Sequence, residues 1–350
     1  MAGGSTDART AAGYEDLVHR AALHHDRSRR VFRVSGDRAP GMLQGLITAD
    51  ISEPGDGAAW PTLILTPKGR VLADAVVLRV DGELLLDLPE AAWAGLEPHF
   101  GRYLPPRFAK LEPTSLRVLR IRGPYALERA AAVLPELGSI PPTRREEDEG
   151  VRWGAVRCGE GFAVGRDEPG AGGIDLLLPA AEGSRPAPGL ELPTASPEAW
   201  EIWRVERGIP LYGRDVSEDN LPQETGLVAE ATSFSKGCYT GQEVLARIHY
   251  RGKVNRHLRG LRVPDSSPDR GAESTAGGPP LAAGDELRQG ERVVGAVTSA
   301  VRSPRFGLIG LGYLRREVEP GDEVAVRPGG DAPADGRDEA TARVVGLPFD

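Results

Sequence analysis

The chain has 350 residues, of which 43 are basic and 51 acidic, so its net charge is −8. This length predicts two or three domains, and the acidic balance argues against non-specific binding to nucleic acid or anionic membranes. Two cysteines are too few for a disulfide framework or for a four-thiolate iron–sulfur cluster within one chain. We find no run of about 18 apolar residues and no apolar signal segment, so we expect a cytoplasmic protein without a membrane partner.

The first part of the chain alternates short strands with short helices. The predicted strands are Arg30–Val34, Trp60–Thr66, Arg70–Val80, Glu83–Leu88 and Ser115–Ile121, and the predicted helices are Pro40–Ile47, Pro89–Leu104 and Pro124–Leu134. The pair Asp81-Gly82 is typical of a two-residue hairpin turn, so the strands on either side of it should be antiparallel.

The middle of the chain continues this mixture. Residues 140–149 are rich in Pro, Arg and Glu and predict a surface loop, whereas Arg152–Val164 and Gly173–Leu178 predict strands. Ser196–Gly208 predicts a helix with clear end signals, because a capping serine and Pro197 open it and a glycine closes it. Short antiparallel strands mixed with helices indicate an α+β fold.

The C-terminal part is predicted to be all β. Its strand-like runs are Leu258–Val263, Arg292–Val301, Phe306–Tyr313, Glu323–Val326 and Thr341–Leu347, and glycine turns separate them. This spacing is typical of a small β-barrel or sandwich. Pro264–Pro280 and Pro328–Ala340 are predicted to be flexible loops.

The segment Lys236–Glu243 reads Lys-Gly-Cys-Tyr-Thr-Gly-Gln-Glu and carries the chemistry that stands out most. Glycines let the backbone approach a ligand, and a neighbouring cation can raise the thiolate fraction of a cysteine. Cys238 is therefore a candidate reactive thiol, although a free cysteine is also often a small buried hydrophobe.

Other motifs are weaker. The basic run Arg251–His257 could hold an anionic tail such as a polyglutamate or a phosphate, or could simply be a solvated face. His24 and His25 lack partners at ligand spacing, so no metal site is expected. No phosphate-binding glycine loop or serine nucleophile elbow supports a kinase, dehydrogenase or hydrolase.

Four elements in order resemble the YgfZ family. Lys236–Glu243 resembles its K-G-C-[aromatic]-x-G-Q-E signature, and the likeness extends to Arg259. The other three elements are Gln44–Asp50 (Q-G-x-x-T-x-D), the hairpin Leu65–Arg70, and the helix end Trp203–Pro210 (R-x-E-x-G-x-P). This family is related to the T-protein of glycine cleavage, an aminomethyltransferase that uses tetrahydrofolate.

The resemblance implies a cloverleaf of three domains around a central folate channel, the last a small β-barrel. The first α+β domain would comprise residues 13–123 together with 195–253, the second α+β domain residues 124–194, and the barrel residues 254–350.

The resemblance also implies roles for individual residues. Glu206 corresponds to the acid that hydrogen-bonds the pterin, and Asp74 falls where the T-protein keeps its essential aspartate, which some YgfZ members lack. Cys238 and Asp74 would carry the chemistry. The remaining folate contacts would come from Thr66, Lys236, Gly237, Tyr239, Gln242, Glu243 and Arg251. On their own residue types, Glu206 could be a solvated acid at a helix end and Asp74 a solvent-facing strand residue.

The leading functional hypothesis is a tetrahydrofolate-binding accessory factor for the assembly or repair of iron–sulfur proteins, with client proteins or assembly machinery as partners. The alternative is a tetrahydrofolate-dependent aminomethyltransferase. A tRNA-associated role through Arg251–Arg259 is the weakest hypothesis, because the run has no interleaved aromatic residues for base stacking.

Overall fold

The computed structural model describes residues 13–52, 56–166, 172–179, 189–264, 281–329 and 340–350. They form two compact units. The first contains the described residues up to Trp200, together with Ser217–Pro222 and Leu227–Tyr250. The second contains Glu201–Val216, Gln223–Gly226 and the described residues from Arg251 onward. The finer division into three domains stays a prediction.

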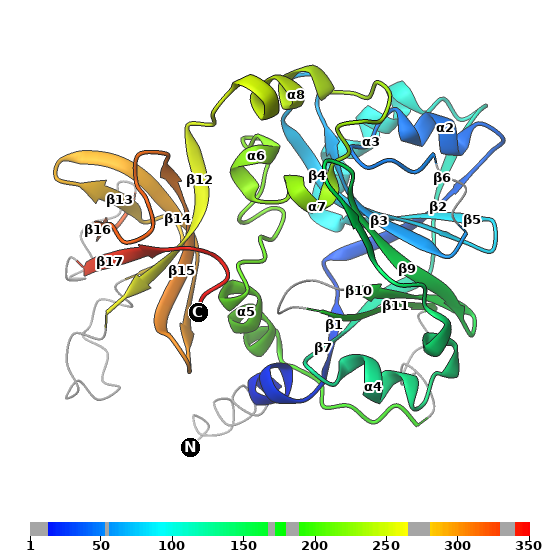
Figure 1. The fold of residues 1–350 in the computed structure, drawn as a ribbon, viewed down its shortest axis with the longest axis horizontal. Coiled ribbons are helices and arrows are strands. Elements are labelled where there is room, and N and C mark those ends of the chain that lie inside the picture. The colour runs from blue at the N-terminus through cyan, green and yellow to red at the C-terminus, as the bar shows by residue number, and fades with distance from the viewer. Residues whose placement is uncertain (1–12, 53–55, 167–171, 180–188, 265–280, 330–339) are drawn as a thin grey trace. The chain divides into compact units, whose positions relative to one another are not determined.

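The first unit is built on an 11-stranded antiparallel sheet (Figure 1). Ten strands follow one another in the order β1-β7-β11-β10-β9-β3-β4-β5-β2-β6, and β8 pairs with β9. The strands are β1 (Ala22–Asp26), β2 (Arg29–Ser35), β3 (Ala58–Leu65), β4 (Val71–Val80), β5 (Glu83–Pro89), β6 (Lys110–Pro113), β7 (Leu116–Arg122), β8 (Arg144–Glu146), β9 (Gly150–Cys158), β10 (Gly161–Arg166) and β11 (Gly173–Pro179).

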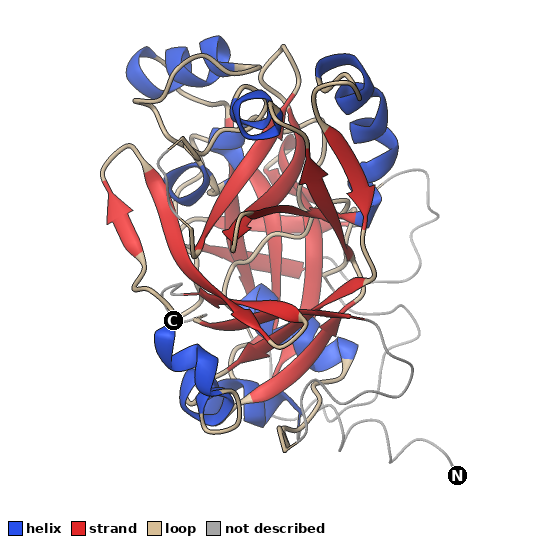
Figure 2. Cartoon of the chain, turned by 90° about the vertical axis from the view of Figure 1, so that its right-hand side faces the viewer, coloured by secondary structure: helices blue, strands red, loops and turns tan. Residues whose placement is uncertain are grey.

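The helices of the chain are short (Figure 2). Residues 13–19 are helical. The others are α2 (Ala39–Gln44), η1 (Glu90–Ala92), α3 (Trp93–Tyr103), α4 (Ala126–Ala131), η2 (Pro135–Ser139), α5 (Pro197–Glu206), α6 (Pro222–Thr225), α7 (Val228–Ala231) and α8 (Gln242–Arg251). Two apolar clusters fill the first unit, one containing Trp153 and Phe162 and the other containing Cys158 and residues of α4. The sheet therefore provides the rigid frame for the loops that it carries.

The predicted hairpin between β4 and β5 is confirmed. Val80 pairs with Glu83, and Asp81 and Gly82 have φ values of 51° and 74°. Positive φ at both turn residues is the geometry that an Asp-Gly pair adopts easily. This register places Asp87 opposite Val76. Because side chains two apart on a strand share a face, Asp74 and Asp87 lie on the same face of neighbouring strands.

Several local predictions differ from the structure. The helix expected over Pro40–Ile47 ends at Gln44, and the strand expected over Arg152–Val164 is two strands. Gly159 has a φ of 56° and lies in the tight turn at which Cys158 pairs with Gly161, so the chain reverses there. The prediction missed β1, β6, β8, α6 and α7, because segments of three to five residues carry little periodicity, and it also missed the ten-residue helix α8.

The second unit contains a closed six-stranded barrel with the order β12-β15-β14-β13-β16-β17. Pairing of β12 with β17 closes it, and an apolar cluster that includes Leu261 and Val344 fills it. Its strands are β12 (Arg256–Val263), β13 (Glu286–Gln289), β14 (Arg292–Ser303), β15 (Gly307–Arg315), β16 (Glu323–Arg327) and β17 (Ala340–Val345). The predicted barrel is confirmed, with β13 as an unpredicted strand. The two predicted loops lie mostly outside the described residues.

Candidate functional site

Three of the four sequence elements that resemble the YgfZ family meet in the first unit. The Thr240 N–H donates to the Gly45 carbonyl at 3.0 Å, which joins the cysteine element to the Gln44–Asp50 element. A Cβ at Gly241 would lie 2.7 Å from the Thr66 carbonyl oxygen, so the same element also packs closely on the β3–β4 hairpin. The fourth element, Trp203–Pro210, belongs to the second unit.

Lys236 anchors the segment that carries Cys238, residues 232–241, which we call the Cys238 loop. Its Nζ donates to the main-chain carbonyls of Gln44, Ile47 and Ala49 at 2.7, 2.9 and 2.7 Å. The residue is only 6% exposed. Because an ammonium group has three N–H donors, these carbonyls use all of them. The predicted role of Lys236 as a folate contact therefore competes with an internal role.

The N-terminal end of the Cys238 loop is fixed by the turn between β8 and β9. Ser233 donates to Glu149 at 2.7 Å, Ser235 also donates to this carboxylate, and the Phe234 N–H donates to the Asp148 carbonyl at 2.7 Å. Loops held by several hydrogen bonds lose little further entropy on binding. The loop thus presents its central residues on a fixed backbone.

The two cysteines lie in opposite environments. Cys158 is buried in an apolar cluster, and burial raises the pKa of its thiol. Cys238 is exposed, as is Gly237 before it. Cysteine reactivity requires access and thiolate formation, so Cys158 is the structural cysteine and Cys238 is the accessible one. Of the two readings of Cys238, the structure excludes the buried hydrophobe.

The remaining residues of the signature shape the start of α8. The Gln242 side chain accepts a hydrogen bond from the Tyr239 N–H at 3.4 Å, and Glu243 is exposed in the first turn of the helix. Tyr239 is buried, and burial raises the pKa of its hydroxyl. In the hairpin, the Thr66 hydroxyl accepts from the Arg70 N–H at 3.0 Å. These residues all belong to the first unit, and several of them form hydrogen bonds within the loop or the hairpin itself.

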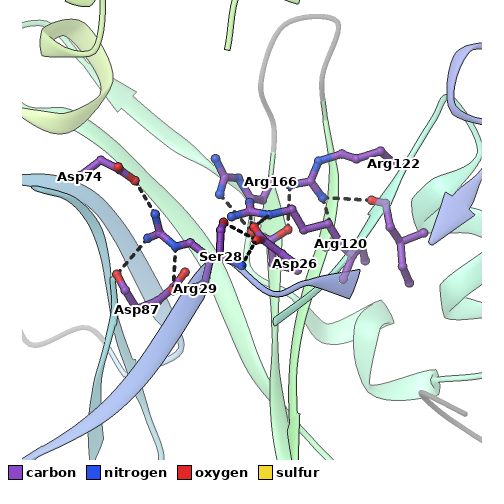
Figure 3. A network of polar contacts seen from close by, with 11 residues as sticks. Asp26, Ser28, Arg29, Asp74, Asp87, Arg120, Arg122 and Arg166 are labelled. Atoms are coloured by element: carbon purple, nitrogen blue, oxygen red, sulfur yellow. Dashed lines mark hydrogen bonds and ion pairs between the residues drawn. The ribbon is translucent and has the colours of Figure 1, made fainter. Parts of the chain in front are cut away.

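Asp74 is held by an arginine that the sequence did not suggest (Figure 3). Arg29 Nη1 donates to Asp74 Oδ2 at 2.5 Å, while its Nε and Nη2 donate to Asp87 Oδ1 and to the Asp87 carbonyl at 2.9 and 3.0 Å. The side chains of Arg29 and Asp87 are each 6% exposed, and that of Asp74 is 33% exposed. Asp74 is therefore a fixed carboxylate at the edge of a buried ion-pair group, and not a freely solvated strand residue.

The electrostatics of this group follow from burial. Burial opposes the charge of Arg29, but the carboxylates of Asp87 and Asp74 raise its pKa. Burial raises the pKa of Asp87 despite its ion pair. Arg29 shares one face of β2 with the buried Val31, but the exposed Arg33 lies on that face too. The sequence therefore carried only a weak signal that Arg29 would be buried and would need a buried partner.

A second group of ion pairs continues across the sheet (Figure 3). Arg120 bridges Asp26 and Asp175 at 2.7 and 3.1 Å, and Arg122 and Arg166 also bind Asp175. Although burial opposes its charge, Arg120 and Ser28 lower the pKa of Asp26 to about 2. These charges are satisfied within the sheet, and among the described residues no group of three or more His, Cys, Asp or Glu side chains could hold a metal ion.

Glu206 and Arg251 belong to the second unit. Glu206 ends α5 and is 1% exposed, and its Oε1 accepts from the Ser303 hydroxyl at 2.5 Å. It is therefore not the solvated helix-end acid that its residue type allowed. Arg251 is exposed at the end of α8.

The predicted capping of α5 is confirmed, because Ser196 Oγ accepts from the Ala199 N–H at 3.1 Å.

Comparison with known proteins places this geometry in context. Residues 256–350 match the family described as the glycine cleavage T-protein C-terminal barrel domain. The crystal structure of the glycine cleavage system aminomethyltransferase T from Bartonella henselae superposes with a TM-score of 0.75 over 97% of this chain and 89% of that chain, at 18% identity. The fold is thus that of an aminomethyltransferase of the T-protein type.

Relatives with three different names align with most of the chain. An aminomethyltransferase of Rubrobacter xylanophilus is 29% identical over 350 residues, which cover 97% of this chain and 84% of the relative. A tRNA-modifying protein YgfZ of Klebsiella pneumoniae is 26% identical over 328 residues, with coverage of 90% and 89%. A mitochondrial iron–sulfur cluster assembly factor IBA57 homolog of Neurospora crassa is 26% identical over 253 residues, with coverage of 68% and 53%.

Within the described part of the chain, no helix is long and apolar enough to span a membrane. The barrel match, the shared fold and the relatives of the YgfZ and IBA57 types agree with the elements found in the sequence. The chain thus matches the T-protein barrel family over residues 256–350 and is similar in sequence to aminomethyltransferases and to proteins of the YgfZ and IBA57 types.

Proposed function

We propose that this chain is a tetrahydrofolate-binding accessory factor for the assembly or repair of iron–sulfur proteins in the cytoplasm. The observation that carries the proposal is the Cys238 loop, which exposes one thiol on a backbone held before the thiol by Ser233 and Lys236 and after it by Thr240. A thiolate is a ligand for iron and a redox group. Iron or a cluster would be cargo, passed to client proteins or exchanged with assembly machinery.

The relatives support this class of function. One is named as an iron–sulfur cluster assembly factor and another as a tRNA-modifying protein of the YgfZ type. Both descriptions fit a factor whose clients include iron–sulfur enzymes that modify tRNA. Direct binding of tRNA by the basic run gains no support, because Arg256 and Arg259 form ion pairs with Glu224 and Glu319 at 3.1 and 3.4 Å.

Tetrahydrofolate is the cofactor that this superfamily suggests, and the donor chemistry fits it. A pterin presents a ring N–H and an exocyclic amine side by side, and a carboxylate can accept both. Glu206 is a buried carboxylate whose Oε1 is oriented by Ser303. Bound folate would supply a one-carbon carrier or a structural effector. Proposed further contacts come from Thr66, Gly237, Tyr239, Gln242, Glu243 and Arg251.

The test of the thiol is complementation of a strain that lacks its own copy of this protein. We expect that, under oxidative stress, a strain carrying Cys238→Ala has the same low iron–sulfur enzyme activities as the strain without the protein. Cys158→Ala is the matched control, because that thiol is buried. Full complementation by Cys238→Ala would remove the thiol from the mechanism. Calorimetry with tetrahydrofolate on wild type and Glu206→Ala tests the cofactor separately.

An aminomethyltransferase is the second candidate, favoured by the Asp74 carboxylate and by the relatives that carry this name. A carboxylate can orient an amine and stabilise developing positive charge during one-carbon transfer. It ranks second because Arg29 already occupies one oxygen of Asp74. Ammonia release from an aminomethylated lipoyl carrier in the presence of tetrahydrofolate would establish this activity, and absence of turnover with folate bound would exclude it.

A further inference from the structure

The site around the Lys236 ammonium is built like a binding site for a small cation. Three main-chain carbonyls converge on Nζ at 2.7–2.9 Å, and the ring centroid of Tyr239 lies 5.0 Å from it. Carbonyl oxygens and an aromatic face are both attracted to positive charge. We call this arrangement the ammonium cage and define it by the carbonyls of Gln44, Ile47 and Ala49 and the Tyr239 ring.

The oxygen distances of the cage run from the three carbonyls to the lysine's own Nζ, so they describe a site that is built around an N–H donor. They suit an ammonium ion, whose N–H groups donate to oxygens at these lengths. The nearby acid is Asp50, whose carboxylate is engaged by Gln44 and by the Ser52 N–H at 2.7 and 2.8 Å. The cage itself therefore offers neutral oxygens, which favour a single positive charge.

We infer that the ammonium cage is a monovalent-cation site whose occupant is the protein's own Lys236, and that Lys236 is a positioning residue for Cys238. When the lysine side chain is shortened, the empty cage should accept a free alkylammonium ion. The inference rests on the proposed function only for the role of the Cys238 thiol. The cage joins two chain segments that are 187 to 192 residues apart, so filling it fixes the Cys238 loop against the Gln44–Asp50 element.

Burial also affects the protonation of Lys236, the occupant of the cage. It lowers the pKa of Lys236 to about 7, whereas the carbonyls favour the protonated form because a neutral amine has only two N–H groups for three acceptors. The cage therefore holds the lysine in its protonated form, and a protonated primary amine of the same length should fill it in the same way.

The experiment uses the full-length Lys236→Ala variant and propylammonium, which replaces the atoms removed beyond Cβ. Amide exchange of Thr240 reports on the loop, because its N–H donates to the Gly45 carbonyl. We expect exchange at Thr240 to rise about tenfold or more in the variant, and propylammonium to restore most of the protection. The rate at which iodoacetamide labels Cys238 should differ between Lys236→Ala and wild type, and propylammonium should return it towards the wild-type rate.

Two controls separate this result from general destabilisation. Propanol has the same shape without the charge and should restore nothing. Lys253→Ala removes an exposed lysine and should leave Thr240 exchange unchanged. Unaltered Thr240 exchange in Lys236→Ala, or a folded variant that propylammonium does not restore, would overturn the inference. Neither result depends on folate binding or on complementation, so the proposed function is tested separately.

A measurement on the wild type keeps the inference open to refutation if the variant does not fold. The buried ammonium of Lys236 should give ¹⁵N-detected N–H signals that exchange slowly with water. Exchange as fast as that of the exposed Lys253 ammonium would show that the cage does not hold the group.

Discussion

Removal of Arg29 should destabilise the first unit far more than removal of an exposed arginine on the same strand. Arg29 and Asp87 form an ion pair with both side chains 6% exposed. Loss of one partner of such a pair leaves a buried charge without compensation, which costs about 3–5 kcal/mol. Arg33 pairs with Glu83, but these side chains are 50% and 28% exposed, so this pair contributes about 0.2–1 kcal/mol.

The comparison is made with Arg29→Met and Arg33→Met, because methionine keeps much of the apolar stem in both. Urea unfolding followed by circular dichroism should show a difference of about 2–4 kcal/mol between the variants. A double variant, Arg29→Met with Asp87→Leu, should recover most of the loss, since it removes both charges. The reasoning fails if the two single variants are equally stable, or if the double variant is no more stable than Arg29→Met.

Three further changes have definite expected results. His24 stacks on Trp200 at 4.2 Å and burial lowers its pKa to about 4, so the unfolded state binds more protons between about pH 4 and 6.5. Wild type should therefore lose stability relative to His24→Phe as the pH falls through this range, and parallel pH curves would contradict this. Ser303→Ala removes a hydrogen bond to the Glu206 carboxylate and should cost about 1.5–3 kcal/mol in urea unfolding, with weaker folate binding by calorimetry. Gly241→Ala should cost about 1–3 kcal/mol or more of stability, because Gly241 has a φ of 83° and a Cβ there would lie 2.7 Å from a carbonyl oxygen. Gly237→Ala is its control in thermal unfolding, because a Cβ at Gly237 would meet no atom within 4 Å.

Predictions from local chemistry held where the signal was local. The Asp81-Gly82 turn and the capping of α5 by Ser196 were recognisable because each depends on a few neighbouring residues. The barrel was recognisable from glycine turns at short intervals, although β13 carries too few residues to show a period. The unusual sequence around Cys238 identified the loop, but it did not show that the thiol of Cys238 would be exposed.

The sequence by itself determined the α+β character, the C-terminal barrel and the elements that meet around Cys238, because turn chemistry and alternation act over a few residues. Only the tertiary structure decided what those residues do. Lys236 meets carbonyls 187 to 192 residues away, and Arg29 meets Asp74 and Asp87 45 and 58 residues away. Such partners are brought together by strand register and loop packing, which no local period records. The burial that perturbs these charges likewise exists only after the sheet has formed.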